Sequence, residues 1–139
     1  MKPILLCDVC GKSAAEVNSM VTFFSDGRRS PVASLPHLAD VHVTCTAECT
    51  RRSEVRAKAM GLEYDGCHHA DEMSGGRAMW HLQQRLWCMR VEPGSKVMQK
   101  LFDVFLNLAQ LPTWDSGLPF NIVLTHGRGM PRRKRKSSK

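Results

Sequence analysis

The chain has no apolar run approaching the roughly 18 residues of a membrane-spanning helix, so we expect no transmembrane segment and no membrane partner. Its opening apolar stretch, Ile4 to Leu6, is too short for a secretory signal sequence. Without an export signal, we expect the thiols to lie in a reducing compartment, where paired cysteines favour metal over disulfides. The expected location is therefore intracellular, nuclear in a eukaryotic host and cytoplasmic otherwise.

Most sequence patterns of enzymes are also absent. No Pro-Cys-x-x-Cys of the zinc deaminases occurs, and neither a nucleophilic triad nor a Gly-rich phosphate loop can be identified. His42, on an expected strand just ahead of a cysteine pair, resembles the catalytic His of HNH nucleases. The Asn and His that this family carries downstream have no match after Cys49. We therefore expect no enzyme, and keep a metal-dependent nuclease as a subordinate alternative.

Acidic residues are missing from the C-terminal segment. From Arg128 onward there are seven basic residues and no Asp or Glu, which accounts for the whole formal net charge of +7. The body of the protein is therefore electrically balanced, and we expect residues 127–139 to form a disordered basic tail. The run from Pro131 to Lys136 resembles a short nuclear-import signal and equally a phosphate-binding arm.

Four cysteines form two close pairs, Cys7-x2-Cys10 and Cys45-x3-Cys49, with 34 residues between the pairs. Two short turns can bring four thiolates to one tetrahedral Zn²⁺ at about 2.3 Å each. Such a site is closed and structural, because no coordination position remains for a substrate. Cys67 or His42 could instead replace one of the four ligands.

The elements around these cysteines alternate in kind. We expect strands over Met20–Phe24 and Val41–Thr44, a turn at Ser25–Gly27 with a loop from there to Asp40, and a helix from Thr46 to Met60 that Gly61 ends. One cysteine pair on a knuckle and the other at a helix start resembles the treble-clef zinc fingers. The resemblance covers residues 4–61 and implies a structural Zn²⁺, although the second pair here is C-x3-C rather than C-x2-C.

The second half of the chain is expected to be helical. Apolar spacing predicts helices over 77–90, capped by Ser74, and from Ser95 to about Gln110, followed by a strand over 120–125. The fold class is therefore α+β: a treble-clef-like zinc module packed with two C-terminal helices and a short strand. The expected domains are a zinc module at 1–61, a linker at 62–75, a helical unit at 76–126 that completes the core, and the tail.

A second metal site is also conceivable. Two turns of helix separate His81 and Cys88, and the expected linker carries Cys67 and His69. These four residues, Cys67, His69, His81 and Cys88, could bind a second zinc. Their irregular spacing favours a solvated His pair and a core cysteine instead.

Basic residues on the helix after the second cysteine pair, together with the tail, favour nucleic-acid binding, to DNA or RNA, in a regulatory role. The residues expected to contact phosphates are Arg51, Arg52, Arg56, Lys58, Arg128, Arg132, Arg133, Lys134, Arg135 and Lys136. The alternative is an adaptor or inhibitor that acts on a larger nucleic-acid machine through its apolar helices, as a monomer or a homodimer. That alternative predicts an exposed apolar patch on residues 79–109, where Trp80 and Trp87 share one helix face.

Overall fold

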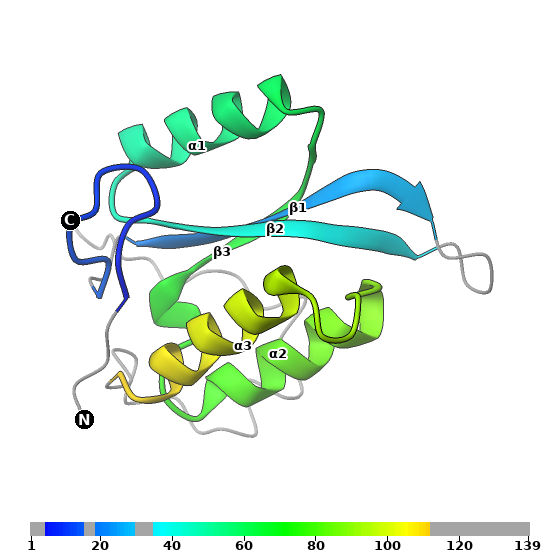
Figure 1. The fold of residues 1–139 in the computed structure, drawn as a ribbon. Helices are drawn as coiled ribbons and strands as arrows, with labels where there is room; N and C mark the ends of the chain where they lie inside the picture. Colours follow the sequence, from blue (N-terminus) through cyan, green and yellow to red (C-terminus); the bar gives the residue numbers. More distant parts are fainter. Residues whose placement is uncertain (1–4, 16–18, 30–34, 112–139) are drawn as a thin grey trace.

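A three-stranded antiparallel sheet in the order β2-β1-β3 forms the centre of the structure, a computed structural model that describes residues 5–15, 19–29 and 35–111. The strands are β1 (Met20–Arg29), β2 (Pro36–Thr44) and β3 (Glu63–His69). The helices are α1 (Ala47–Ala59), the short 3-10 turn η1 (Ala70–Glu72), α2 (Arg77–Cys88) and α3 (Lys96–Ala109). The fold is therefore α+β, as predicted, with α1 on one face of the sheet and α2 and α3 on the other (Figure 1).

The β1–β2 hairpin is longer than expected. Both strands extend into the turn and loop that the sequence indicated at residues 25–40, β1 to Arg29 and β2 from Pro36. The register shifts between Phe24 and Ser25, after which Ser25 still pairs with Leu38 and Arg29 with Pro36. Such bulges keep two strands paired across residues with poor strand propensity, here an Asp-Gly pair in which Gly27 takes a φ of +87°.

Residues 62–75 are not the expected linker. Most of them form β3 and η1, and β3 pairs with β1 from Ser25 opposite Glu63 to Met20 opposite His69. The boundary expected after residue 61 therefore falls between α1 and β3, and the chain on both sides of it contributes strands to the same sheet. The segment has no alternation of apolar and polar residues. It therefore forms a strand because it hydrogen-bonds to the edge of β1.

The helix boundaries follow local capping signals with one exception. Ser95 caps α3 by accepting a hydrogen bond from the Met98 amide at 3.1 Å, and Gly61 follows α1 with a φ of +81°. Ser74 does not cap α2, because its hydroxyl donates to the Asp71 carbonyl oxygen at 3.3 Å. Gly76 takes the cap position without a side-chain bond.

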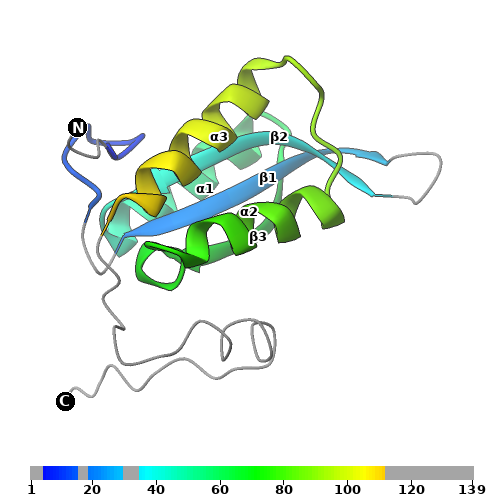
Figure 2. The same ribbon diagram turned by 90° about the horizontal axis from the view of Figure 1, so that it is seen from below.

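The two faces of the sheet differ in chemistry. Val21, Phe23, Val41 and Val43 point toward α2 and α3 and join the main hydrophobic core, which includes Phe105. Seen from the side of these helices, α3 runs across β2 while α2 lies beside it (Figure 2). The other face meets α1 through a more polar set of residues: Thr22, Phe24, His42, Thr44 and Ser53.

The strand expected at 120–125 and the basic tail at 127–139 lie outside the described residues. Among the helices that the structure does describe, none has the length and apolar character needed to cross a membrane.

Candidate metal centre

The first cysteine pair lies on a tight turn within residues 5–15. The turn closes through hydrogen bonds from the Cys7 amide to the Lys12 oxygen (2.8 Å) and from the Ala14 amide to the Leu5 oxygen (2.7 Å). Gly11, with a φ of +80°, supplies the left-handed residue that this reversal requires. The sequence therefore builds a tight loop that carries Cys7 and Cys10.

Backbone amides point at one of these sulfurs. The amides of Val9 and Cys10 both donate to the Cys7 sulfur at 3.4 Å. Burial raises the pKa of the Cys7 thiol, but these amide bonds outweigh burial and lower the pKa to about 6. This lowered pKa favours the thiolate form of Cys7 near neutral pH.

The second pair comes from the junction of β2 and α1. Cys45 directly follows β2, and Cys49 lies in the first turn of α1. Thr46 caps this helix, its side-chain oxygen accepting from the Cys49 amide at 3.1 Å.

The four sulfurs converge on one point. The sulfurs of Cys7, Cys10, Cys45 and Cys49 all lie within 4.8 Å of one another, with Cys10 to Cys45 at 3.4 Å and Cys45 to Cys49 at 4.0 Å. Thiolates about 2.3 Å from one tetrahedral ion would be roughly 3.8 Å apart. All six cysteines are free thiols. The spacing therefore fits a four-thiolate metal site, as the sequence predicted.

A cation would stabilise the fully deprotonated form of this cluster. Burial, and then the neighbouring thiols of Cys10, Cys7 and Cys49, raise the pKa of Cys45 to about 12. Protons alone would therefore keep part of the cluster neutral at pH 7. A divalent ion removes this conflict by stabilising four adjacent thiolates.

Asp8 ties the knuckle to the rest of the fold. Its amide donates to the Val43 oxygen and its carboxylate accepts from the Val43 amide, both at 2.7 Å. Its other carboxylate oxygen accepts from Lys100 on α3 at 3.1 Å. Sequence analysis missed this role: Asp8 stands within the first cysteine pair, but nothing local connects it to a lysine 92 residues away.

His42 does not join the cluster. Its Nδ1 is 2.6 Å from the Ser53 hydroxyl and its Nε2 is 2.9 Å from Asp40, so both ring nitrogens already have partners. The chain of Ser53, His42 and Asp40 has the residue types of a nucleophilic triad. Ser53, however, is fully buried on the inner side of α1, which leaves no access for a substrate.

Asp40 remains ionised in this network. Burial raises the pKa of its carboxyl group, but the hydrogen bond from His42 and the charges of His42 and Lys100 lower it overall. The group therefore orients the imidazole and links β2 to α1.

The structure does not bring the second candidate set together. Cys67 accepts a hydrogen bond from the Tyr64 hydroxyl at 3.2 Å, whereas His81 and Cys88 lie on α2. His68, between Cys67 and His69 on β3, is the residue whose ring meets His81, at a centroid distance of 5.2 Å. Because neighbouring residues of a strand point to opposite faces, Cys67 and His69 lie across the sheet from α2. Within the described ranges, the four-cysteine cluster is the one group suited to a metal.

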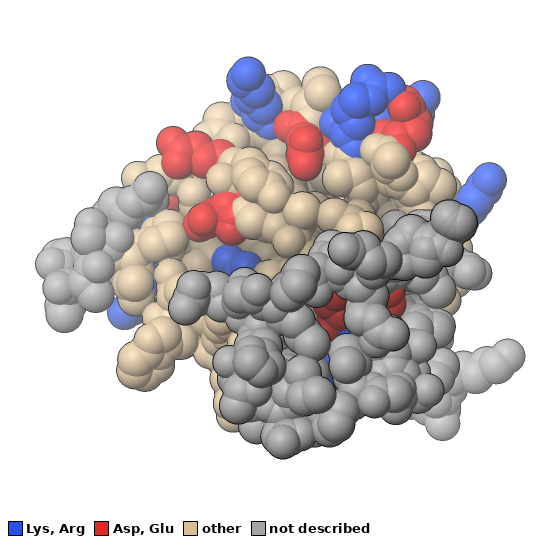
Figure 3. Space-filling view, turned by 180° about the vertical axis from the view of Figure 1, so that it is seen from behind, with Lys and Arg blue, Asp and Glu red and all other residues tan. Residues whose placement is uncertain are grey.

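The predicted basic residues of α1 are exposed. Figure 3 shows Lys and Arg side chains over α1, at the top of the view, with Asp and Glu side chains among them. Glu48 pairs with Arg51 and with Arg52, the latter at 3.1 Å. These basic residues are Arg51, Arg52, Arg56 and Lys58. The tail residues Arg128, Arg132, Arg133, Lys134, Arg135 and Lys136 lie outside the described part of the chain.

Apolar side chains are exposed on α2 and α3. Trp87 is 85% exposed, Leu106 57% and Met79 50%. A hollow of about 260 Å³ lies between the two helices, lined by Met79, Leu82, Phe102 and Leu106.

A scan against protein-family models, a search of curated proteins and a search of solved structures each find no match to this chain.

Proposed function

We propose that the protein is a zinc-stabilised nucleic-acid-binding protein with a regulatory role. Four thiolates fill a tetrahedral site, so the metal has no open position for chemistry and acts as a structural support. Zn²⁺ is the ion that best suits an all-thiolate tetrahedron. The proposal places the protein in a reducing intracellular compartment, where these thiols remain available to the metal.

The observation that carries the proposal is the position of the basic helix. Cys49 and its cap Thr46 fix the first turn of α1, and Ser53 and Ala57 bury its inner side against the sheet. The outer side is thereby presented on a rigid support. Phosphate contacts need this arrangement, because cations held on a rigid helix bind phosphates with less loss of conformational entropy.

Arg56 and Lys58 are the residues best able to contact phosphate. Both are exposed near the end of α1, and neither forms an ion pair with another described residue. Arg51 and Arg52 share Glu48, which reduces the positive potential on the first turns. The basic tail would add further phosphate contacts to those of the helix.

The test is the salt dependence of binding to a labelled DNA duplex and a labelled RNA of mixed sequence. The double substitution Arg56→Gln and Lys58→Gln should lower affinity and reduce the salt slope by about 1 to 2 units. A matched pair on the opposite side, Arg90→Gln with Lys96→Gln, should leave the slope nearly unchanged. Truncation after Gly127 should flatten the slope further. Equal effects of both pairs, or no binding at low salt, would refute the proposal.

A second candidate function is an interaction adaptor that self-associates through α2 and α3. The exposed apolar residues on these helices favour it. This surface is suited to pairing with a copy of itself. Exposed Met79 and Leu106 border an apolar hollow, and in a dimer they would fill the same hollow of the second copy.

Sedimentation of the full chain tests this candidate. Leu106→Glu should convert a dimer to a monomer, while Val55→Glu on the outer side of α1, an exposed apolar position of similar type, should not. A wild-type chain that is monomeric at high concentration rules out the dimer.

A further inference from the structure

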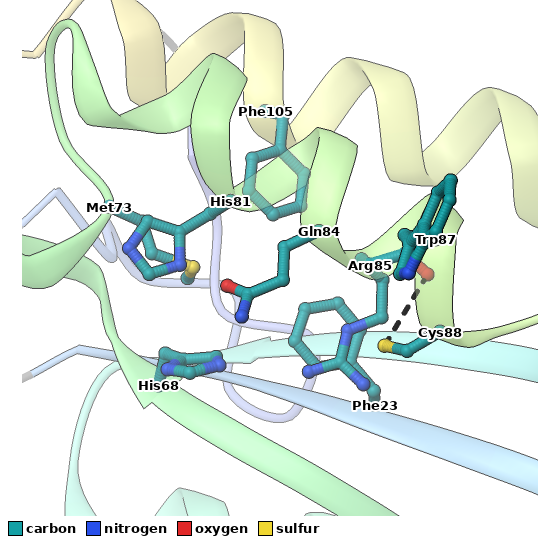
Figure 4. Close-up of a pocket in the computed structure, with 9 residues that line it drawn as sticks. All are labelled: Phe23, His68, Met73, His81, Gln84, Arg85, Trp87, Cys88 and Phe105. Carbon is teal, nitrogen blue, oxygen red and sulfur yellow. Dashed lines mark hydrogen bonds between the residues drawn. The ribbon is translucent and has the colours of Figure 1, made fainter. Parts of the chain in front are cut away.

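A cavity of about 310 Å³ lies between α2 and the sheet, away from the cysteine cluster. It exists because α2 packs mainly against α3, so that long side chains span the distance from α2 to β1 and β3. Figure 4 shows His81, Gln84 and Arg85 extending from α2 toward His68 and Phe23. The volume is near the lower end for small-molecule sites.

Arg85 brings a partly buried positive charge into this cavity. Its guanidinium carbon lies 3.9 Å from the centroid of the Phe23 ring. Its Nη1 donates to the backbone carbonyl oxygen of Asp65 at 3.3 Å and to the Met89 sulfur at 3.4 Å. Among the described residues, no carboxylate comes within ion-pair distance of it; the Asp65 carboxylate acts on it only at longer range. A guanidinium has five N–H donors, so most of its donors remain for a ligand.

The neighbouring polar groups are neutral and do not supply the missing anion. Burial is the main cause that lowers the pKa of His68 and of His81, the latter to about 3. At neutral pH both rings therefore carry no charge, and the His81 ring already bonds to the backbone of Glu72. Gln84 adds an exposed amide at the same cavity.

The rest of the lining is aromatic and apolar. Phe23, Phe105 and Met73 are fully or almost fully buried, and Trp87 is largely exposed at the side of the cavity. A small inorganic anion would leave the exposed indole ring of Trp87 uncovered. A flat ring would bury it, since aromatic side chains favour stacked or edge-on contact with other rings.

We propose that the cavity binds a small planar aromatic carboxylate, with its carboxylate on Arg85 and its ring against Trp87. A guanidinium matches a carboxylate in a paired, two-bond geometry that a neutral amide cannot reproduce. Helix α2, which contributes much of the lining, lies on the opposite face of the sheet from α1 (Figure 1), so this proposal is separate from nucleic-acid binding through α1.

The experiment measures binding of benzoate, 1-naphthoate and indole-3-carboxylate to the full chain by calorimetry and by Trp fluorescence. Each carboxylate is compared with its neutral carboxamide. At least one carboxylate should bind, and its carboxamide should bind at least about tenfold more weakly. Failure of all three at millimolar concentration, or equal binding of acid and amide, would overturn the proposal.

Three variants locate the site. Arg85→Met should weaken carboxylate binding at least about tenfold, whereas Arg90→Met, an exposed arginine after α2 with the same loss of charge, should not change it. Gln84→Glu removes no buried group, so the fold is kept, and its negative charge should also weaken binding. Carboxylate binding that survives both Arg85→Met and Gln84→Glu would place the ligand elsewhere.

Discussion

The two faces of the central sheet hold their helices by different means. On the α3 side, Phe105 lies against Phe23 at a ring-centroid distance of 6.5 Å, within a continuous apolar core. On the α1 side, hydrogen bonds dominate: Thr44 to Thr50 at 2.6 Å and His42 to Ser53 at 2.6 Å. The cysteine cluster lies at the start of this second, polar layer.

This difference predicts where a metal in the cysteine cluster would matter most. Apolar burial stabilises α3 without any ion, since its free energy depends on the area removed from water. Hydrogen bonds contribute only about 1 kcal/mol each, because water competes for both partners in the unfolded chain. We therefore expect α1 to depend on the metal, and α3 to depend on the core.

Loss of a cysteine ligand should have the largest effect. Cys7→Ser should abolish stoichiometric metal binding and release α1, because metal binding contributes on the order of 10 kcal/mol to the folding of such modules. Metal analysis and hydrogen exchange check this, with lost protection expected in α1 before α3. Cys88→Ser, an exposed thiol outside the cluster, is the control. Retained protection of α1 in Cys7→Ser would contradict the comparison.

Truncation of the core should act on the other face. Phe105→Ala should lower the free energy of unfolding by about 3–5 kcal/mol, the cost of an aromatic cavity, while one metal per chain is retained. Urea unfolding followed by circular dichroism measures the loss. Phe102→Ala, at a position 37% exposed on the same helix, should cost much less. Similar losses in both variants would show that the core is not centred on Phe105.

Lower pH should weaken the apolar face through His81. Burial first, then the charges of His68 and Arg77, lower its folded pKa to about 3, whereas the unfolded value is about 6.5. Between these values the unfolded chain binds more protons, so stability falls as pH falls below 6.5, by up to about 1.4 kcal/mol per pH unit.

The variant His81→Gln should remove this part of the pH dependence. Urea unfolding at several pH values between 7 and about 5 would show a shallower slope than in wild type. Metal content is measured in parallel, so that proton competition at the cysteines is separated from the histidine effect. Identical slopes in the two proteins would refute the assignment.

The smallest effect should come from Lys100, which connects the two regions. Its Nζ lies 3.1 Å from Asp8 in the knuckle and 3.8 Å from Asp40 on β2. The pair is partly solvated, so Lys100→Met should cost about 0.2–1 kcal/mol, and less at high salt. Lys96→Met is the matched control on the same helix. A larger loss that salt does not change would indicate a packing role for Lys100 instead.

Local signals predicted much of this molecule. The spacing of the four cysteines indicated the cluster, and Ser95 and Gly61 indicated the start of α3 and the end of α1. The helix start and end depend on neighbours within a few residues, and the cluster depends on cysteine, a residue type that few other roles require in close pairs. A capping hydroxyl or a left-handed glycine acts the same way in any fold.

Other features escaped prediction because their causes are distant in the chain. β3 has little strand propensity, and only its pairing with β1 makes it a strand. The same pairing places Cys67 and His69 on the opposite face from His81 and Cys88, which separates the second metal set. Nothing near Arg85 in sequence shows that its guanidinium lies over Phe23.

The amino-acid sequence by itself determined the ligand set, the capped helices and the balance of charge, because these are properties of residue type and short spacing. Only the tertiary structure decided which side chains share a face, which strand lies at the edge of the sheet, and where a buried cation meets a cavity. Those outcomes come from long-range strand pairing and helix packing, whose geometry no local stretch of the chain contains.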